Sequence, residues 1–168
     1  MKKLFFLFTG ISLLVLYYYS STRTVVQYEE VKPLLHAQYY EHEKSQLLQQ
    51  LEYWTERLGN QPTNSVYQHK LARLQAQYFR LTGEVNSLRQ SDSLLLDLAE
   101  RFPNTVTHWQ GLAQNAIAEH EFAKADFYAN QALAIGEKRY QSSLINVDVL
   151  LERGNRHEAI GILNALGN

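Results

Sequence analysis

Four polar side chains that can bind carboxylates and peptide groups recur at helical spacing: Lys70, Arg73, Gln77 and Arg80. Their separations of three, four and three residues place them on one face of a helix. Lysine and arginine form charge-assisted hydrogen bonds with carboxylates, so this face predicts a grip on an acidic segment or on a C-terminal carboxylate. The competing interpretation is a solvated helix face without a ligand.

The sequence offers little for catalysis or metal binding. Of six histidines, the nearest to a metal cluster stand in the group His36, Glu41, His42 and Glu43. Histidines six residues apart do not share a helix face, so we expect no metal site there. The chain contains no GxSxG, P-loop, GxGxxG or HExxH motif, and no carboxylate pair at a spacing suited to acid–base work. We therefore expect neither an enzyme nor a bound cofactor.

The amino-acid composition excludes several classes of protein and of binding site. The 168 residues leave room for one modest domain, and a hydrophobic fraction of 45% argues for a folded core. A net charge of −1 gives no basic surface for nucleic acid. Cysteine is absent, which excludes disulfides, thiolate zinc sites, haem-attachment motifs and a lipoprotein anchor.

The N-terminal residues 1–24 predict a membrane anchor. Lys2 and Lys3 precede a segment, residues 4–22, that carries no charge and has the aromatic run Tyr17–Tyr19 near its end. At about 1.5 Å per residue it is short but sufficient to cross a bilayer. The lysines favour a cytoplasmic N-terminus and the bulk of the chain outside, which in a bacterium is the periplasm. The alternatives are a cleaved signal peptide, for which the small residues at the cut are poorly placed, and a buried core helix.

After this segment the hydrophobic pattern is helical, and glycine and proline divide it into about seven helices. Breaks are expected at residues 58–62, 82–83 and 102–104, and at Gly136, Gly154 and Gly167. The predicted helices cover about 34–58, 65–81, 86–102, 106–119, 122–136, 140–153 and 156–166. The first helix carries an apolar stripe formed by Leu47, Leu51, Trp54 and Leu58. This stripe is interpreted either as a cap on the helices that follow or as a homodimer contact.

Residues 106–139 resemble one tetratricopeptide repeat. Trp109 and Leu112 stand at the Trp and Leu positions of that pattern, and Ala113 replaces its glycine. The small and apolar positions of the second helix are filled by Ala125, Ala132 and Leu133. A partial repeat follows at 140–167, with a turn at Gly154 and a packing alanine at Ala159, and a loose one precedes at 65–103.

The resemblance implies an all-α fold: an N-terminal transmembrane helix followed by a right-handed helical solenoid of about three helix pairs. It divides the chain into an anchor (1–24), a linker with a capping amphipathic helix (25–62) and a repeat domain (63–168). Trp109 and Leu112 are expected to fill the space between paired helices, where the alanines allow close approach. Gly111 lies within a helix at a cost of about 1 kcal/mol, which close packing would offset.

The resemblance also implies a concave groove that holds an extended peptide. In one register of the loose repeat, the face with Lys70 and Arg80 lines this groove. In the other register, which is shifted by one residue, the groove is lined by His69, Ala72, Ala76 and Phe79. The clear repeat would contribute Thr107, Gln110, Gln114 and Ile117. The last unit would contribute Gln141, Leu144, Asp148 and Leu151.

Together these features predict a non-catalytic adaptor, tethered to a bacterial inner membrane with its repeats in the periplasm and binding a peptide segment of a protein partner. The alternative is a structural subunit of a membrane complex or a homo-oligomer. The resemblance in layout to tethered repeat proteins does not select the partner.

Overall fold

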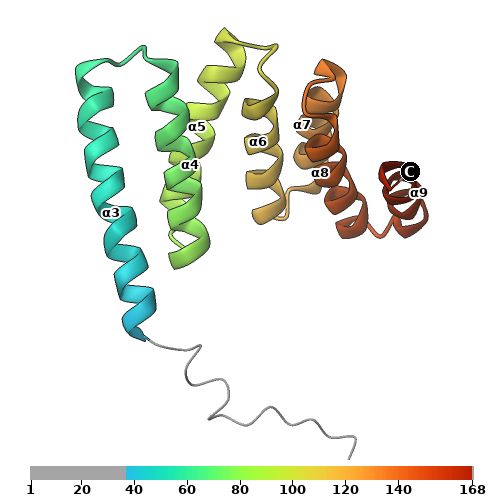
Figure 1. The fold of residues 1–168 in the computed structure, drawn as a ribbon, viewed down its shortest axis with the longest axis horizontal. Helices are drawn as coiled ribbons and strands as arrows, with labels where there is room; N and C mark the ends of the chain where they lie inside the picture. Colours follow the sequence, from blue (N-terminus) through green and yellow to red (C-terminus); the bar gives the residue numbers. More distant parts are fainter. Residues whose placement is uncertain (1–36, 168) are drawn as a thin grey trace, which may run out of the picture. The chain divides into compact units, whose positions relative to one another are not determined.

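A computed structural model describes residues 37–167, and every regular element in that range is a helix (Figure 1). The bounds are α3 (Ala37–Asn60), α4 (Ser65–Thr82), α5 (Val85–Arg101), α6 (Val106–Ala118), α7 (Phe122–Ile135), α8 (Arg139–Glu152) and α9 (Arg156–Leu166). The all-α fold and the seven predicted helices are therefore confirmed for this range. The helix ends agree with the predicted ones to within a few residues.

The predicted membrane segment, residues 4–22, lies outside the described residues. Among the helices from α3 to α9, none combines the length and the apolar character needed to cross a membrane.

Local signals explain where the helices begin and end. Asn64 precedes α4, and its Oδ1 accepts hydrogen bonds from the backbone N–H groups of Val66 and Tyr67 at 3.1 and 3.2 Å, as an N-cap does. Gly83 ends the helix with a φ of 74°, a left-handed conformation that glycine adopts without strain. The end of α3 at Asn60 falls within the expected break at residues 58–62, two residues beyond the predicted helix end.

The compact unit that runs from Tyr40 onwards packs its helices in chain order. Three helical hairpins, α4–α5, α6–α7 and α8–α9, follow one another, and α3 packs on the first of them. Contacts also join α4 to α6 and α6 to α8, so the first helices of successive hairpins are neighbours. The α3 stripe faces inward, since Leu47 and Leu51 are buried with Leu71 and Leu74 of α4.

The core contains most of the residues expected there. Leu112, Ala113 and Ala125 have at most 1% of their surface exposed, and Ala132 and Ala159 are equally buried. Trp109 and Leu133 are only half-buried. Trp109 packs beside the cluster of Ala72, Leu95, Ala99 and Leu112, and its indole N–H donates to the Pro103 carbonyl at 2.8 Å.

Gly111 lies in the middle of α6 for a packing reason. A methyl group added at its Cα would lie 2.9 Å from Leu95 Cδ1 of α5, closer than ordinary carbon contacts. The missing side chain thus lets α6 approach α5 closely.

Candidate functional site: a groove between α4 and α6

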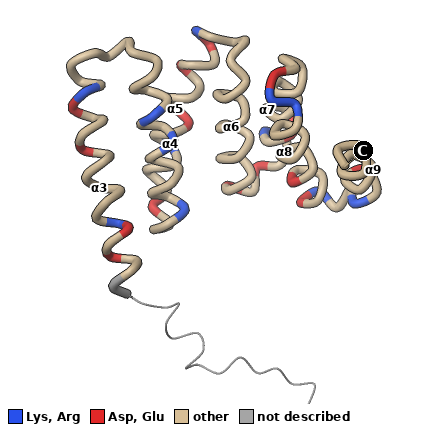
Figure 2. Tube along the Cα trace, in the orientation of Figure 1, with Lys and Arg blue, Asp and Glu red and all other residues tan. Residues whose placement is uncertain are grey.

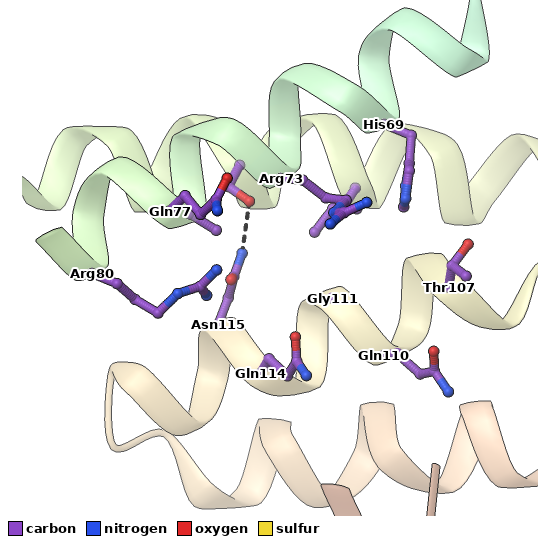
Figure 3. A pocket seen from close by; sticks show the side chains of 12 residues that line it. His69, Arg73, Gln77, Arg80, Thr107, Gln110, Gly111, Gln114 and Asn115 are labelled. Carbon is purple, nitrogen blue, oxygen red and sulfur yellow. Dashed lines mark hydrogen bonds between the residues drawn. The ribbon is translucent and has the colours of Figure 1, made fainter. Parts of the chain in front are cut away.

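A groove of about 280 Å³ lies between α4 and α6, with α5 beneath it (Figure 3). The α4 wall is formed by His69, Arg73, Ala76, Gln77 and Arg80. The α6 wall is formed by Thr107, Gln110, Gly111 and Gln114, and the floor by Ser91, Leu95 and Asn115. Helical spacing accounts for both walls, because residues three, four and seven apart share one face.

Most of the polar groups on the two walls have no partner within residues 37–167. The guanidinium groups of Arg73 and Arg80 are exposed and form no ion pair there, and Gln77 and Gln114 form no hydrogen bond. Figure 3 shows Arg73, Gln77 and Arg80 directed toward the space between the helices. The donors and acceptors are therefore available to a ligand.

The floor, by contrast, is internally satisfied. Asn115 is 2% exposed, and its Nδ2 donates to Ser91 Oγ at 2.9 Å (Figure 3). The same Nδ2 donates to Asp92 Oδ1 at 2.8 Å. Burial raises the pKa of Asp92, an effect that the Asn115 hydrogen bond opposes. At the rim, Gln110 Nε2 donates to Ser142 Oγ of α8 at 2.9 Å.

Charge is divided unequally between the walls. Helix α4 carries Lys70, Arg73 and Arg80 and no acidic residue, whereas α6 carries no Lys, Arg, Asp or Glu at all (Figure 2). The groove therefore has one cationic and one neutral wall.

Two histidines lie in contact at one end of the groove. The sequence did not predict this contact. The rings of His69 and His108 have centroids 5.3 Å apart, and the Nδ1 atoms of both are buried without a hydrogen-bond partner. Burial, with a contribution from the charges of His69 and Arg101, lowers the pKa of His108 to about 4. Burial, with contributions from Arg73 and Lys138, also lowers the pKa of His69. The His108 ring is therefore neutral at pH 7, and the lowered pKa favours the neutral form of His69 as well.

Of the predicted binding residues, the structure brings together Arg73, Gln77, Arg80, Gln110 and Gln114. The two registers considered for the loose repeat both contribute, since His69 and Ala76 line the groove as well. Ala72, also assigned to the second register, has none of its surface exposed and belongs to the core.

Six of the residues predicted to line the groove lie elsewhere. Lys70 does not line the groove, although it is on α4. Ile117 packs against the buried cluster of α6, α7 and α8, because its position on α6 faces the next hairpin. Asp148 is exposed on α8 and lines no part of the groove, and neither do Gln141, Leu144 and Leu151.

No cluster of three or more potential metal ligands is formed by the side chains that the structure describes. His42, one of the residues considered for a metal, forms a 3.0 Å hydrogen bond with Gln46 one turn along α3.

Comparisons of the chain with protein families, with curated proteins and with solved structures found no match. The arguments that follow therefore rest on the residues and contacts of this chain.

Proposed function

We propose that this chain is a non-catalytic adaptor that holds an extended peptide segment of a protein partner in the groove between α4 and α6. The observation that carries the proposal is a set of polar side chains on both walls that have no side-chain partner within residues 37–167: Arg73, Gln77, Arg80 and Gln114. A peptide supplies amide N–H and C=O groups along its length, which are the partners that such side chains accept.

The arrangement of hairpins supports a tetratricopeptide-like right-handed solenoid as the scaffold. In such a solenoid the first helices of successive hairpins line the inner face, and here α4, α6 and α8 are neighbours in that order. The proposal includes a tether through residues 4–22 in a bacterial inner membrane, with the helices on the periplasmic side.

Site-specific photo-cross-linking tests this proposal in the full chain. A photoreactive amino acid at Gln114, on the groove wall, should form an adduct with one partner segment. The same residue at Ser93, exposed on α5 and outside the groove, should not. Equal adducts at both positions, or none at Gln114, would argue against a peptide-binding groove.

A structural role remains the second candidate, and one observation favours it. The last hairpin exposes apolar side chains at the end of the chain: Ile160 is 56% exposed and Leu163 43%. A second copy covering this face would make the chain a homo-oligomer. Light scattering of the full chain would then report a mass above that of one chain, and Ile160→Glu with Leu163→Glu would return it to the monomer.

The α3 stripe is less suited to that role. Leu47 and Leu51 are buried against α4, and Trp54 and Leu58 pack on the same cluster. These side chains stabilise the first hairpin, which agrees with the capping interpretation.

A further inference from the structure

The groove concentrates positive charge without a compensating acid. Arg73 and Arg80 lie on a wall that has no acidic residue, and the facing helix, α6, is uncharged. Lys138, between α7 and α8, lies near enough to His69 for its charge to lower the pKa of that histidine. The positive charge that lines the groove thus lies on its α4 wall.

Two arginines elsewhere in the unit have partners inside the fold, whereas Arg89, Arg139 and Arg156 are exposed and lie outside the groove. Arg101 bonds with Asp97, Gln68 and the Thr63 carbonyl, and Arg153 forms an ion pair with Asp126 at 2.7 Å. Each of these guanidinium groups has an acidic partner inside the fold. Arg73 and Arg80 have no such partner within residues 37–167 and they line the groove, so their donors face any carboxylate that enters it.

The spacing of the two groups suggests an extended ligand. Arg73 and Arg80 are seven residues apart on α4, which is about 10 Å along the helix axis. An extended peptide advances about 3.3 Å per residue, so the two guanidinium groups span about three residues of peptide. Gln77 lies between them and Gln114 on the opposite wall (Figure 3), where their amides can pair with the peptide backbone.

We propose that the ligand of this groove is an acidic, extended peptide segment, whose side-chain carboxylates bind Arg73 and Arg80 while its backbone pairs with Gln77 and Gln114. The inference rests on the proposed function and specifies its ligand. Nucleic acid is the less suitable anion, because no Phe, Tyr or Trp lines the groove for bases to stack on.

Selection from a random library of twelve-residue peptides tests the chemistry without assuming a sequence. The full chain, kept in mild detergent, is compared with Arg73→Glu/Arg80→Glu and with a matched control, Arg89→Glu/Arg156→Glu. The control reverses two exposed arginines outside the groove and changes the net charge equally. We expect enrichment of Asp and Glu with the wild type and the control, and loss of that enrichment with the groove variant.

Affinity measurements then quantify the charge contribution. A selected acidic peptide should lose about 10- to 100-fold in affinity when its acids become Gln or when Arg73→Gln/Arg80→Gln replaces the wild type, as expected for charge-assisted hydrogen bonds. Binding should also weaken between about 50 and 500 mM salt. Thermal melts confirm that each variant is folded.

The outcomes separate this inference from the proposed function. Enriched peptides without acidic bias would overturn the acidic ligand and leave the peptide groove standing. No enrichment of any peptide would overturn both. Binding of a fifteen-residue oligothymidylate that is as tight as the acidic peptide, and equally lost in the groove variant, would assign the groove to nucleic acid instead.

Discussion

Helix α6 has two sides that differ in almost every physical respect. On one side an alanine seam, formed by Ala113, Ala116, Ala125 and Ala129, joins it to α7 with at most 4% of any of these residues exposed. On the other side Thr107, Gln110 and Gln114 border the groove. The same helix thus stabilises the fold with one side and offers hydrogen-bonding groups with the other. Substitutions on the two sides should therefore affect stability and binding separately.

The largest effect on stability is expected at the seam. Ala129→Leu adds three carbons where none of the surface is exposed, and overpacking of this kind costs about 3 kcal/mol. Chemical denaturation followed by circular dichroism measures this change. Ala134→Leu, at an exposed position of the same helix, is the control and should change stability by less than about 0.5 kcal/mol. Equal effects at the two positions would contradict a tightly packed seam.

Trp109 lies between the two extremes, because it is half-buried. Replacing a fully buried tryptophan by alanine lowers the free energy of unfolding by about 3–5 kcal/mol. Because Trp109 is only half-buried, we expect Trp109→Ala to lower it by about 2–3 kcal/mol. Trp109→Phe, which removes the hydrogen bond to the Pro103 carbonyl, should lose about 1 kcal/mol. The same denaturation experiment measures both, and a loss below 1 kcal/mol for the alanine variant would place the ring outside the core.

The histidine pair should make the end of the groove sensitive to acid. The folded-state pKa of His108 is lowered to about 4, below the value of about 6.5 in the unfolded chain. The unfolded state therefore binds protons first, so stability is full above pH 6.5 and is lost as the pH falls toward 4. Arg73 and Lys138 near His69, and Arg101 near His108, add positive charge around the pair.

Denaturation of the wild type and of His108→Leu at pH 7 and pH 5 isolates this effect. Between pH 7 and pH 5 the free energy of unfolding should fall by about 1–2 kcal/mol more in the wild type than in His108→Leu. His157→Leu, at an exposed site, should lose as much as the wild type. Equal losses of stability in the wild type and in His108→Leu would show that His108 is not held neutral by burial.

The smallest effect on stability is expected in the groove. Arg73→Gln with Arg80→Gln removes two exposed cations that form no ion pair in the described part of the chain, so the free energy of unfolding should change by less than about 0.5 kcal/mol. Binding of the acidic peptide should nevertheless fall as described above. A large loss of stability would show that these arginines support the fold.

The helices could be predicted from the sequence because their limits are set locally. Asn64 supplies an N-cap, Gly83 and Gly136 supply left-handed residues after the last turn, and such effects act within a few residues. The position of Arg73, Gln77 and Arg80 on one face also follows from the helical period.

Contacts between helices could not be predicted in the same way. His69 and His108 are 39 residues apart in sequence, and nothing in either helix indicates that their rings meet. Ile117 has the spacing of a groove residue, but the position of α7 and α8 places it against the core. Only the packing of whole helices decides such cases.

The Asn115 side chain has a consequence for the speed of recognition. Because its amide holds Ser91 and Asp92 of α5, the floor of the groove is already assembled before any ligand arrives. A preassembled floor calls for no slow rearrangement after encounter, so we expect capture of the proposed peptide to be a single step. Its observed rate then rises in proportion to ligand concentration, at a pace governed by diffusion and by the attraction of opposite charges.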